Sequence, residues 1–104
     1  METPSWPNTV FGEQLRQLRK AAGITQEELA FRVSMDRTYI SLLERGIKSP
    51  TLNTFFRLCK VLNQQPAEVI DRVYQRVIQG EQGAEGVPGK NERKEHAGEK
   101  LDTI

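Results

Sequence analysis

The stretch from Arg37 to Arg45, RTYISLLER, carries side chains that can read nucleic acid. At helical spacing its outward positions are Arg37, Thr38, Tyr39, Ser41, Leu42 and Arg45. Arginine can donate two hydrogen bonds to the O6 and N7 atoms of guanine, hydroxyl groups can bond a base or a phosphate, and leucine can contact a thymine methyl group. A helix face that is only solvated usually carries glutamate and lysine instead. The composition therefore predicts a helix that lies in the major groove of double-stranded DNA.

The residues around this stretch predict two short helices joined by a tight turn. Thr25 can cap the first helix, and Glu28, its third residue, completes a capping box. Asp36 can cap the second helix, and Gly46 can end it, because glycine adopts the left-handed conformation without penalty. The inward positions are apolar: Leu29, Ala30, Val33, Ile40 and Leu43. This spacing is that of a helix-turn-helix, in which the second helix enters the major groove.

The segments GITQEELA and RTYISLLERG, followed by a proline, resemble the lambdoid repressor and Cro family, the XRE-type regulators. The resemblance covers residues 9–70. It is strongest to the branch with an R-T-Y-I-S recognition helix, which includes small bacterial repressors and restriction-modification controller proteins. It implies an all-α, five-helix repressor-like DNA-binding domain. It also implies that Arg37, Thr38 and Leu42 read bases and that Gln26 bonds a phosphate at a helix N-terminus.

We therefore predict two sets of DNA contacts. The base-reading set is Arg37, Thr38, Ser41 and Leu42, and the phosphate-binding set is Gln26, Tyr39, Arg45 and Lys48. Phosphate contacts position a protein on DNA, whereas base contacts specify the sequence. Three alternatives remain open: Arg37 as a solvated residue, Tyr39 with its ring packed on the domain, and Leu42 as support for Arg37 and Tyr39.

The resemblance also implies a structural contact beneath the recognition helix. The family counterpart of Arg19 makes a partly buried ion pair with the glutamate that matches Glu44. The same pair here would hold the first helix against the recognition helix and fix the angle at which the latter is presented. Removal of one partner of a buried pair typically costs about 3–5 kcal/mol.

Length and composition support one small domain. The chain has 104 residues, 37% of them apolar, and a net charge of +1 that is unevenly spread. Residues 1–80 carry eleven Lys and Arg against eight Asp and Glu, and residues 81–104 carry four against six. Cys59 is the only cysteine, which excludes a disulfide framework and a cysteine-based zinc site, and we expect it to be inert and buried. No run is apolar enough for a membrane span, and no signal peptide is recognisable, so we expect a cytoplasmic protein without a cofactor.

The remaining segments predict an arm, three further helices and a tail. Residues 1–8 read as an irregular arm whose Trp6 packs back on the domain or contacts a partner, and residues 9–80 read as the domain. Its first helix runs from Asn8 or Thr9 to Ala22. The fourth helix follows Thr51 and turns Leu52, Phe55, Leu58, Cys59 and Leu62 to the core. The fifth begins at Pro66, runs to Gln79 and stops at Gly80. Residues 81–104 read as a disordered tail, where His96 has no cluster of ligands for a metal.

The fifth helix carries a broad apolar stripe: Val69, Ile70, Val73, Tyr74, Val77 and Ile78. We expect the first three of these residues to cap the core. Tyr74, Val77 and Ile78 would then form a surface patch that a second copy covers across a two-fold axis. In the alternative, the stripe packs under the N-terminal arm with Trp6.

These features predict a sequence-specific double-stranded DNA-binding transcriptional regulator, with repression as the leading interpretation, acting as a homodimer on a palindromic operator. The alternatives are a restriction-modification controller, an antitoxin-type regulator with a protein partner, and a protein-interaction adaptor of the transcription machinery. An adaptor would not need Arg37, Thr38 and Tyr39 outward together. The sequence contains neither a His/Cys/Asp constellation nor a glycine-rich phosphate loop, and this argues against an enzyme.

Overall fold

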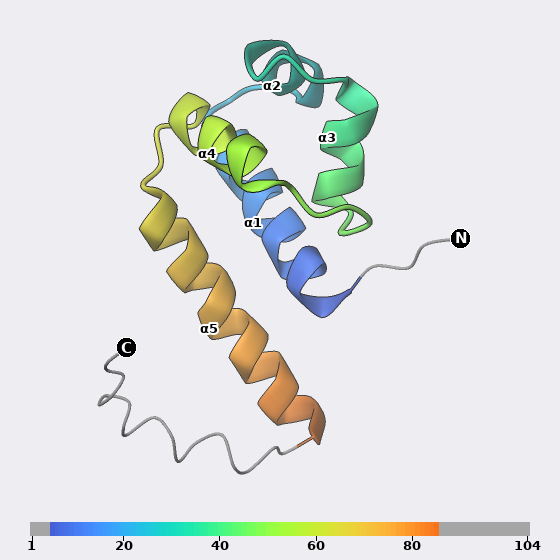
Figure 1. The fold of residues 1–104 in the computed structure, drawn as a ribbon, viewed down its shortest axis with the longest axis vertical. Coiled ribbons are helices and arrows are strands. Elements are labelled where there is room, and N and C mark those ends of the chain that lie inside the picture. Colours follow the sequence, from blue (N-terminus) through green and yellow to red (C-terminus); the bar gives the residue numbers. More distant parts are fainter. Residues whose placement is uncertain (1–4, 86–104) are drawn as a thin grey trace.

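The computed structural model of the protein describes residues 5–85, and over these residues the fold is all-α with five helices, as predicted. The helices are α1 (Trp6–Ala21), α2 (Gln26–Arg32), α3 (Arg37–Glu44), α4 (Leu52–Val61) and α5 (Pro66–Glu85). The short helices α2 and α4 lie near the end of α1, α3 runs beside α1, and the long helix α5 extends away from α2 toward the other end of the molecule (Figure 1). Within this range no helix has the length and apolar character needed to cross a membrane.

The start of α1 differs from the prediction. The helix begins at Trp6, so the irregular arm predicted for residues 1–8 is wrong for residues 6–8, while residues 1–4 lie outside the described range. The Ser5 hydroxyl caps the helix by accepting a hydrogen bond from the Asn8 N–H at 3.3 Å. Pro7 falls in the first turn, where its missing N–H has no intrahelical partner to lose. The proline that suggested an arm is therefore part of a helix start.

Residues from all five helices form one hydrophobic core. The Phe11 and Phe55 rings meet edge to face there, with centroids 5.9 Å apart. The predicted inward residues of α2 and α3 are all buried. Leu52, predicted to face the core, is 71% exposed, because it is the first residue of α4 and the helix meets the core only from Thr54 and Phe55 onward. The buried cluster consists of Phe11, Leu15, Leu29, Ala30, Val33, Ile40, Leu43, Phe55, Leu58, Cys59, Leu62 and Val69.

The end of α5 also differs from the prediction. Pro66 is its first residue, as predicted, but the helix runs through Gly80 to Glu85. A Cβ atom at Gly80 would collide with Trp6 Nε1 and lie 2.5 Å from Trp6 Cε2. Gly80 thus makes room for Trp6, which contacts α5 but stays 43% exposed, and it does not end the helix. Of the tail predicted to be disordered, residues 81–85 are helical and residues 86–104 lie outside the described range.

The stripe on α5 divides between two neighbouring faces. Val69 is buried and Val73 packs against the core, but Ile70 is 51% exposed, so its predicted place in the core is wrong. The reason is helical geometry: one residue further along turns the side chain by about 100°. Arg76 lies on the same side as Val69 and Val73, and its Nη2 atom is 2.7 Å from Glu13 Oε1 of α1. One face of α5 therefore belongs to α1 and the core, and the adjacent face remains on the surface.

Candidate nucleic-acid interface

Local signals place α2 and α3 as a helix-turn-helix. The Thr25 hydroxyl accepts a hydrogen bond from the Glu28 N–H at 3.0 Å and so caps α2, as predicted. Ser34 makes the turn with a left-handed φ of 60°. Asp36 occupies the N-cap position of α3, but its side chain makes no capping hydrogen bond, so that part of its predicted role is wrong. After α3, Gly46 adopts a φ of 79°, as the predicted helix end requires.

The recognition helix α3 is anchored by its inward face. Ile40 and Leu43 are fully buried on the side that faces the core. Arg37 and Thr38, in the first turn, are exposed. In Figure 1, α3 stands at the edge of the fold, with no other described helix beyond it. With its side chains an α-helix is about 10–12 Å across, which fits the major groove of about 12 Å width.

The other side chains predicted to contact DNA, on α3 and after it, differ in how far they are exposed. Arg45 is exposed and its Nε atom donates to Ser41 Oγ at 3.3 Å, while Ser41 itself is half-buried. Leu42 is also half-buried. Tyr39 is half-buried with its side chain against the core cluster, which supports the alternative in which the ring packs on the domain. Lys48 is exposed in the turn that follows α3.

A buried ion pair joins α1 to the end of α3, as the resemblance implied. Arg19 Nε lies 2.6 Å from Glu44 Oε2, and Arg19 Nη2 lies 3.1 Å from Glu44 Oε1. The two side chains are only 10% and 3% exposed. Arg19 Nη1 also donates to the Ile24 carbonyl at 2.9 Å. The hydrogen bond to Glu44 raises the pKa of Arg19 above its ordinary value, so the guanidinium stays charged at every pH at which the protein is handled.

Gln26 is a third member of this contact, which the sequence reasoning missed. Its Nε2 atom donates to Glu44 Oε1 at 3.0 Å, so Glu44 joins α1, α2 and α3 at one point. An amide nitrogen carries two N–H groups. One is used here, and the other can still donate to a phosphate, as predicted for this residue. A buried carboxylate with acceptor positions beyond its arginine partner is the signal that could have suggested the contact.

The predicted dimer residues lie on the surface face of α5 to different degrees. Tyr74 is 58% exposed, whereas Val77 and Ile78 are half-buried. Ile70, one turn before Tyr74, continues the same face. The patch therefore lies nearer the start of α5 than predicted.

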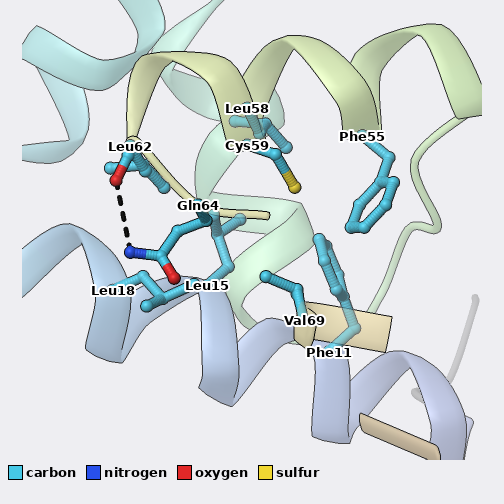
Figure 2. Close-up of a pocket in the computed structure, with 9 residues that line it drawn as sticks. All are labelled: Phe11, Leu15, Leu18, Phe55, Leu58, Cys59, Leu62, Gln64 and Val69. Atoms are coloured by element: carbon cyan, nitrogen blue, oxygen red, sulfur yellow. Dashed lines mark hydrogen bonds between the residues drawn. The ribbon is translucent and has the colours of Figure 1, made fainter. Parts of the chain in front are cut away.

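A small cavity lies near Cys59 in the core, and the part of the chain that the structure describes contains no candidate metal cluster. The cavity has a volume of about 10 Å³, too small for an organic ligand. Figure 2 shows Cys59 among the residues that line it. The thiol is buried, as predicted, and burial raises its pKa. His96, the lone histidine, lies outside the described residues.

An anchored second helix with an exposed arginine and threonine in its first turn defines a DNA-binding helix-turn-helix domain. The sequence profile of the helix-turn-helix family matches residues 15–69, and the chain belongs to this family. Control protein C.BamHI of Bacillus amyloliquefaciens is 38% identical over 63 residues, which cover 60% of this chain and 78% of that protein. The protein is thus a helix-turn-helix transcriptional regulator.

Two solved structures show the same fold. The restriction-modification controller protein C.AhdI from Aeromonas hydrophila is 39% identical, with a TM-score of 0.58, over 60% of this chain and 94% of that one. The controller protein C.Esp1396I, solved as a tetramer in complex with its natural 35 base-pair operator, is 26% identical, with a TM-score of 0.62, over 71% of this chain and 97% of that one. Both relatives are named restriction-modification controller proteins.

Proposed function

We propose that the protein binds a specific double-stranded DNA operator as a homodimer and regulates transcription from it, in the manner of restriction-modification controller proteins. The observation that carries the proposal is the placement of α3. Arg37 and Thr38 are exposed in its first turn, while Glu44 at its other end is held by Arg19 and Gln26. A helix held at a defined angle with base-reading side chains at its N-terminal end is what major-groove recognition requires.

The base-reading roles rest on side-chain chemistry and position. Arg37 donates two hydrogen bonds to a guanine, and Thr38 adds a hydroxyl and a methyl group beside it. Ser41 and Leu42, one turn later, are half-buried and offer a hydroxyl and an apolar contact over a smaller area. Arg37 and Thr38 therefore carry most of the sequence preference.

The residues assigned to phosphate binding lie on and around α3. Gln26 stands at the N-terminus of α2, where unpaired N–H groups favour an anion. Arg45 and Lys48 lie at the opposite end of α3 from Arg37. Tyr39 contributes only the outer part of its side chain, because its ring packs on the core. Contacts on both sides of the groove fix the register of the protein on the duplex.

The dimer forms through the surface face of α5, with Tyr74, Val77 and Ile78 in the interface. Ile70 and Tyr74 lie one helical turn apart on this face and are each more than half exposed, so together they offer an apolar surface that a second copy would cover. Operator binding requires a two-fold arrangement in which the two copies of α3 lie about 34 Å apart and meet successive major grooves. We place the protein in the cytoplasm, and the proposed mechanism uses neither a cofactor nor a catalytic residue.

Binding-site selection tests the proposal directly. The full chain is incubated with random duplex DNA at one fixed salt concentration, and the retained sequences are read. We expect an enriched palindrome whose half-sites lie about 10 base pairs apart, centre to centre. A failure to enrich any sequence would contradict the proposal and favour the protein-interaction adaptor.

A further inference from the structure

Gly12 lies within α1 directly against the C-terminal end of the recognition helix. The residue is buried. A Cβ atom at this position would collide with the Leu43 carbonyl oxygen, lie 2.5 Å from the Glu44 carbonyl oxygen and lie 2.8 Å from the Glu44 carbonyl carbon. All of these are backbone atoms of α3, so they cannot swing aside as the end of a side chain can. Only glycine fits here while α1 and α3 keep their present separation.

A second contact brings the turn after α3 equally close to α1. A Cβ atom at Gly46 would lie 2.8 Å from Thr9 Cα and 2.9 Å from Thr9 Oγ1. Thr9 precedes Gly12 by one turn of α1, and Gly46 follows Glu44 closely in the chain. The close approach at Gly12 therefore extends over neighbouring turns of both segments.

The ion pair lies on the same side of α1. Arg19 follows Gly12 by seven residues, which is close to two helical turns, so the two residues share one face. Glu44 is thus held twice: its backbone rests on Gly12, and its carboxylate binds Arg19. One contact limits how close the two helices come, and the other prevents them from separating.

We propose that Gly12 is a positioning residue for DNA recognition: its missing side chain lets α1 rest on the carbonyl end of α3 and so sets the position from which α3 reads bases. The inference rests on the proposed function. Non-bonded heavy atoms prefer a separation of about 3.5 Å, so a methyl group at Gly12 moves the helices apart by about 1 Å. Hydrogen bonds to bases hold only within about 2.7–3.2 Å.

The same displacement affects phosphate contacts less. Long arginine and lysine side chains can follow a phosphate through rotamer changes, and these contacts carry no sequence information. A defect in positioning therefore separates specific from non-specific affinity, which a general loss of folded protein does not do.

The test compares Gly12→Ala with Gly80→Ala, a second helical glycine whose added Cβ meets the Trp6 side chain instead of α3. The operator is the one selected by the wild-type chain. For each variant, sedimentation and circular dichroism confirm a folded protein in the same oligomeric state. Affinity is then measured for the operator, for unrelated duplex DNA, and for operators with the half-sites moved closer or further by one base pair.

For Gly12→Ala we expect the ratio of specific to non-specific affinity to fall by about tenfold or more, comparable to a lost base contact, with non-specific affinity and salt dependence kept. The preferred half-site spacing should change as well. Gly80→Ala should keep the wild-type affinity ratio and the wild-type half-site spacing. A folded Gly12→Ala protein with the wild-type ratio and spacing preference would overturn the inference.

If Gly12→Ala does not fold, a second variant tests whether this junction positions α3. Thr9→Leu enlarges the side chain that faces Gly46, so it presses on the same junction while keeping the helical preference of α1. It should lower the same ratio, and an unchanged ratio would reject the inference. If the wild-type chain itself selects no operator, the proposed function fails instead, so the two failures are distinguishable.

Discussion

Arg37 is the exposed first residue of α3, and its side chain is the strongest candidate for reading a base. We expect Arg37→Ala to weaken operator binding by about 1–3 kcal/mol per half-site and to relax the preference at one base position, since a bidentate guanine contact is lost. Competition between operators mutated at each position measures this effect. Arg16→Ala, which removes an exposed arginine from α1, is the matched control. An equal loss on all sequences would instead make Arg37 a phosphate contact.

Cys59 gives a pH-dependent prediction. Burial raises the pKa of its thiol above the ordinary value of 9.0, so folding favours the neutral form. Its contribution to the free energy of unfolding is complete below pH 9.0 and is lost as the pH rises through the raised pKa of the folded state. The free energies of unfolding of wild type and Cys59→Val, measured in urea, should therefore diverge as the pH rises above about 9, with the wild type losing more stability. Parallel pH profiles would show that the thiol is not desolvated as the structure indicates.

At the scale of the helices, the two caps of the helix-turn-helix differ in strength. The Thr25 hydroxyl accepts a 3.0 Å hydrogen bond from the backbone of α2, whereas the Asp36 side chain makes no such bond to α3. We expect Thr25→Ala to lower the free energy of unfolding by about 1 kcal/mol, the usual value of a capping bond. Asp36→Ala should cost less, because only the attraction of its charge to the helix end is lost. Thermal or urea unfolding of the two variants compares them, and an equal cost would mean that Asp36 caps α3 in solution.

The elements could be predicted wherever a local signal had a single meaning. The apolar spacing of α2 and α3 predicts two helices, and Gly46 predicts a helix end. The structure contains both features. The errors fall where a residue type has two uses. Pro7 suits an arm and also the first turn of a helix, and Gly80 suits a helix end and also a close approach of Trp6.

In the candidate site, too, the contacts that depend on how the helices pack could not be predicted from local sequence. The pair of Arg19 and Glu44 could be foreseen from the family resemblance, but the bond from Gln26 to Glu44 depends on how three helices meet. The sequence did not indicate the role of Gly12, because the need for glycine inside a helix depends on the backbone that packs against it. Exposure of Leu52 likewise depends on where the core ends, which spacing along one helix does not report.

At the scale of the whole molecule, charge governs how tightly the dimer binds any DNA. With about three or four phosphates neutralised by each subunit, the logarithm of the binding constant should fall with the logarithm of the salt concentration with a slope of about −5 to −7. Lys48→Ala should make the slope shallower by about one per subunit and leave the preferred sequence unchanged. Fluorescence anisotropy over a salt series measures both slopes. A wild-type slope shallower than about −2 would contradict the proposed phosphate contacts.

The dimer sets the distance between two recognition helices, so its interface can be tested through assembly and DNA binding together. Ile70 and Tyr74 are the most exposed apolar residues of the proposed interface face of α5, and charge there should leave the fold of one copy intact. We expect Ile70→Lys combined with Tyr74→Glu to give a monomer with native helicity and much weaker operator binding, because each half-site must then bind independently. Sedimentation and anisotropy measure these outcomes.

Phe31→Gln is the matched control for that double variant, because Phe31 is 81% exposed on α2, outside the proposed interface on α5, and glutamine adds no charge that would change DNA affinity. It removes a large exposed apolar side chain without touching the proposed interface, so the variant should remain a dimer with wild-type operator affinity. If the α5 variant also stays a dimer, the interface lies elsewhere. The exposed Leu52 and Phe56 on α4 would then be the next surface to change, since they lie one helical turn apart on the same face.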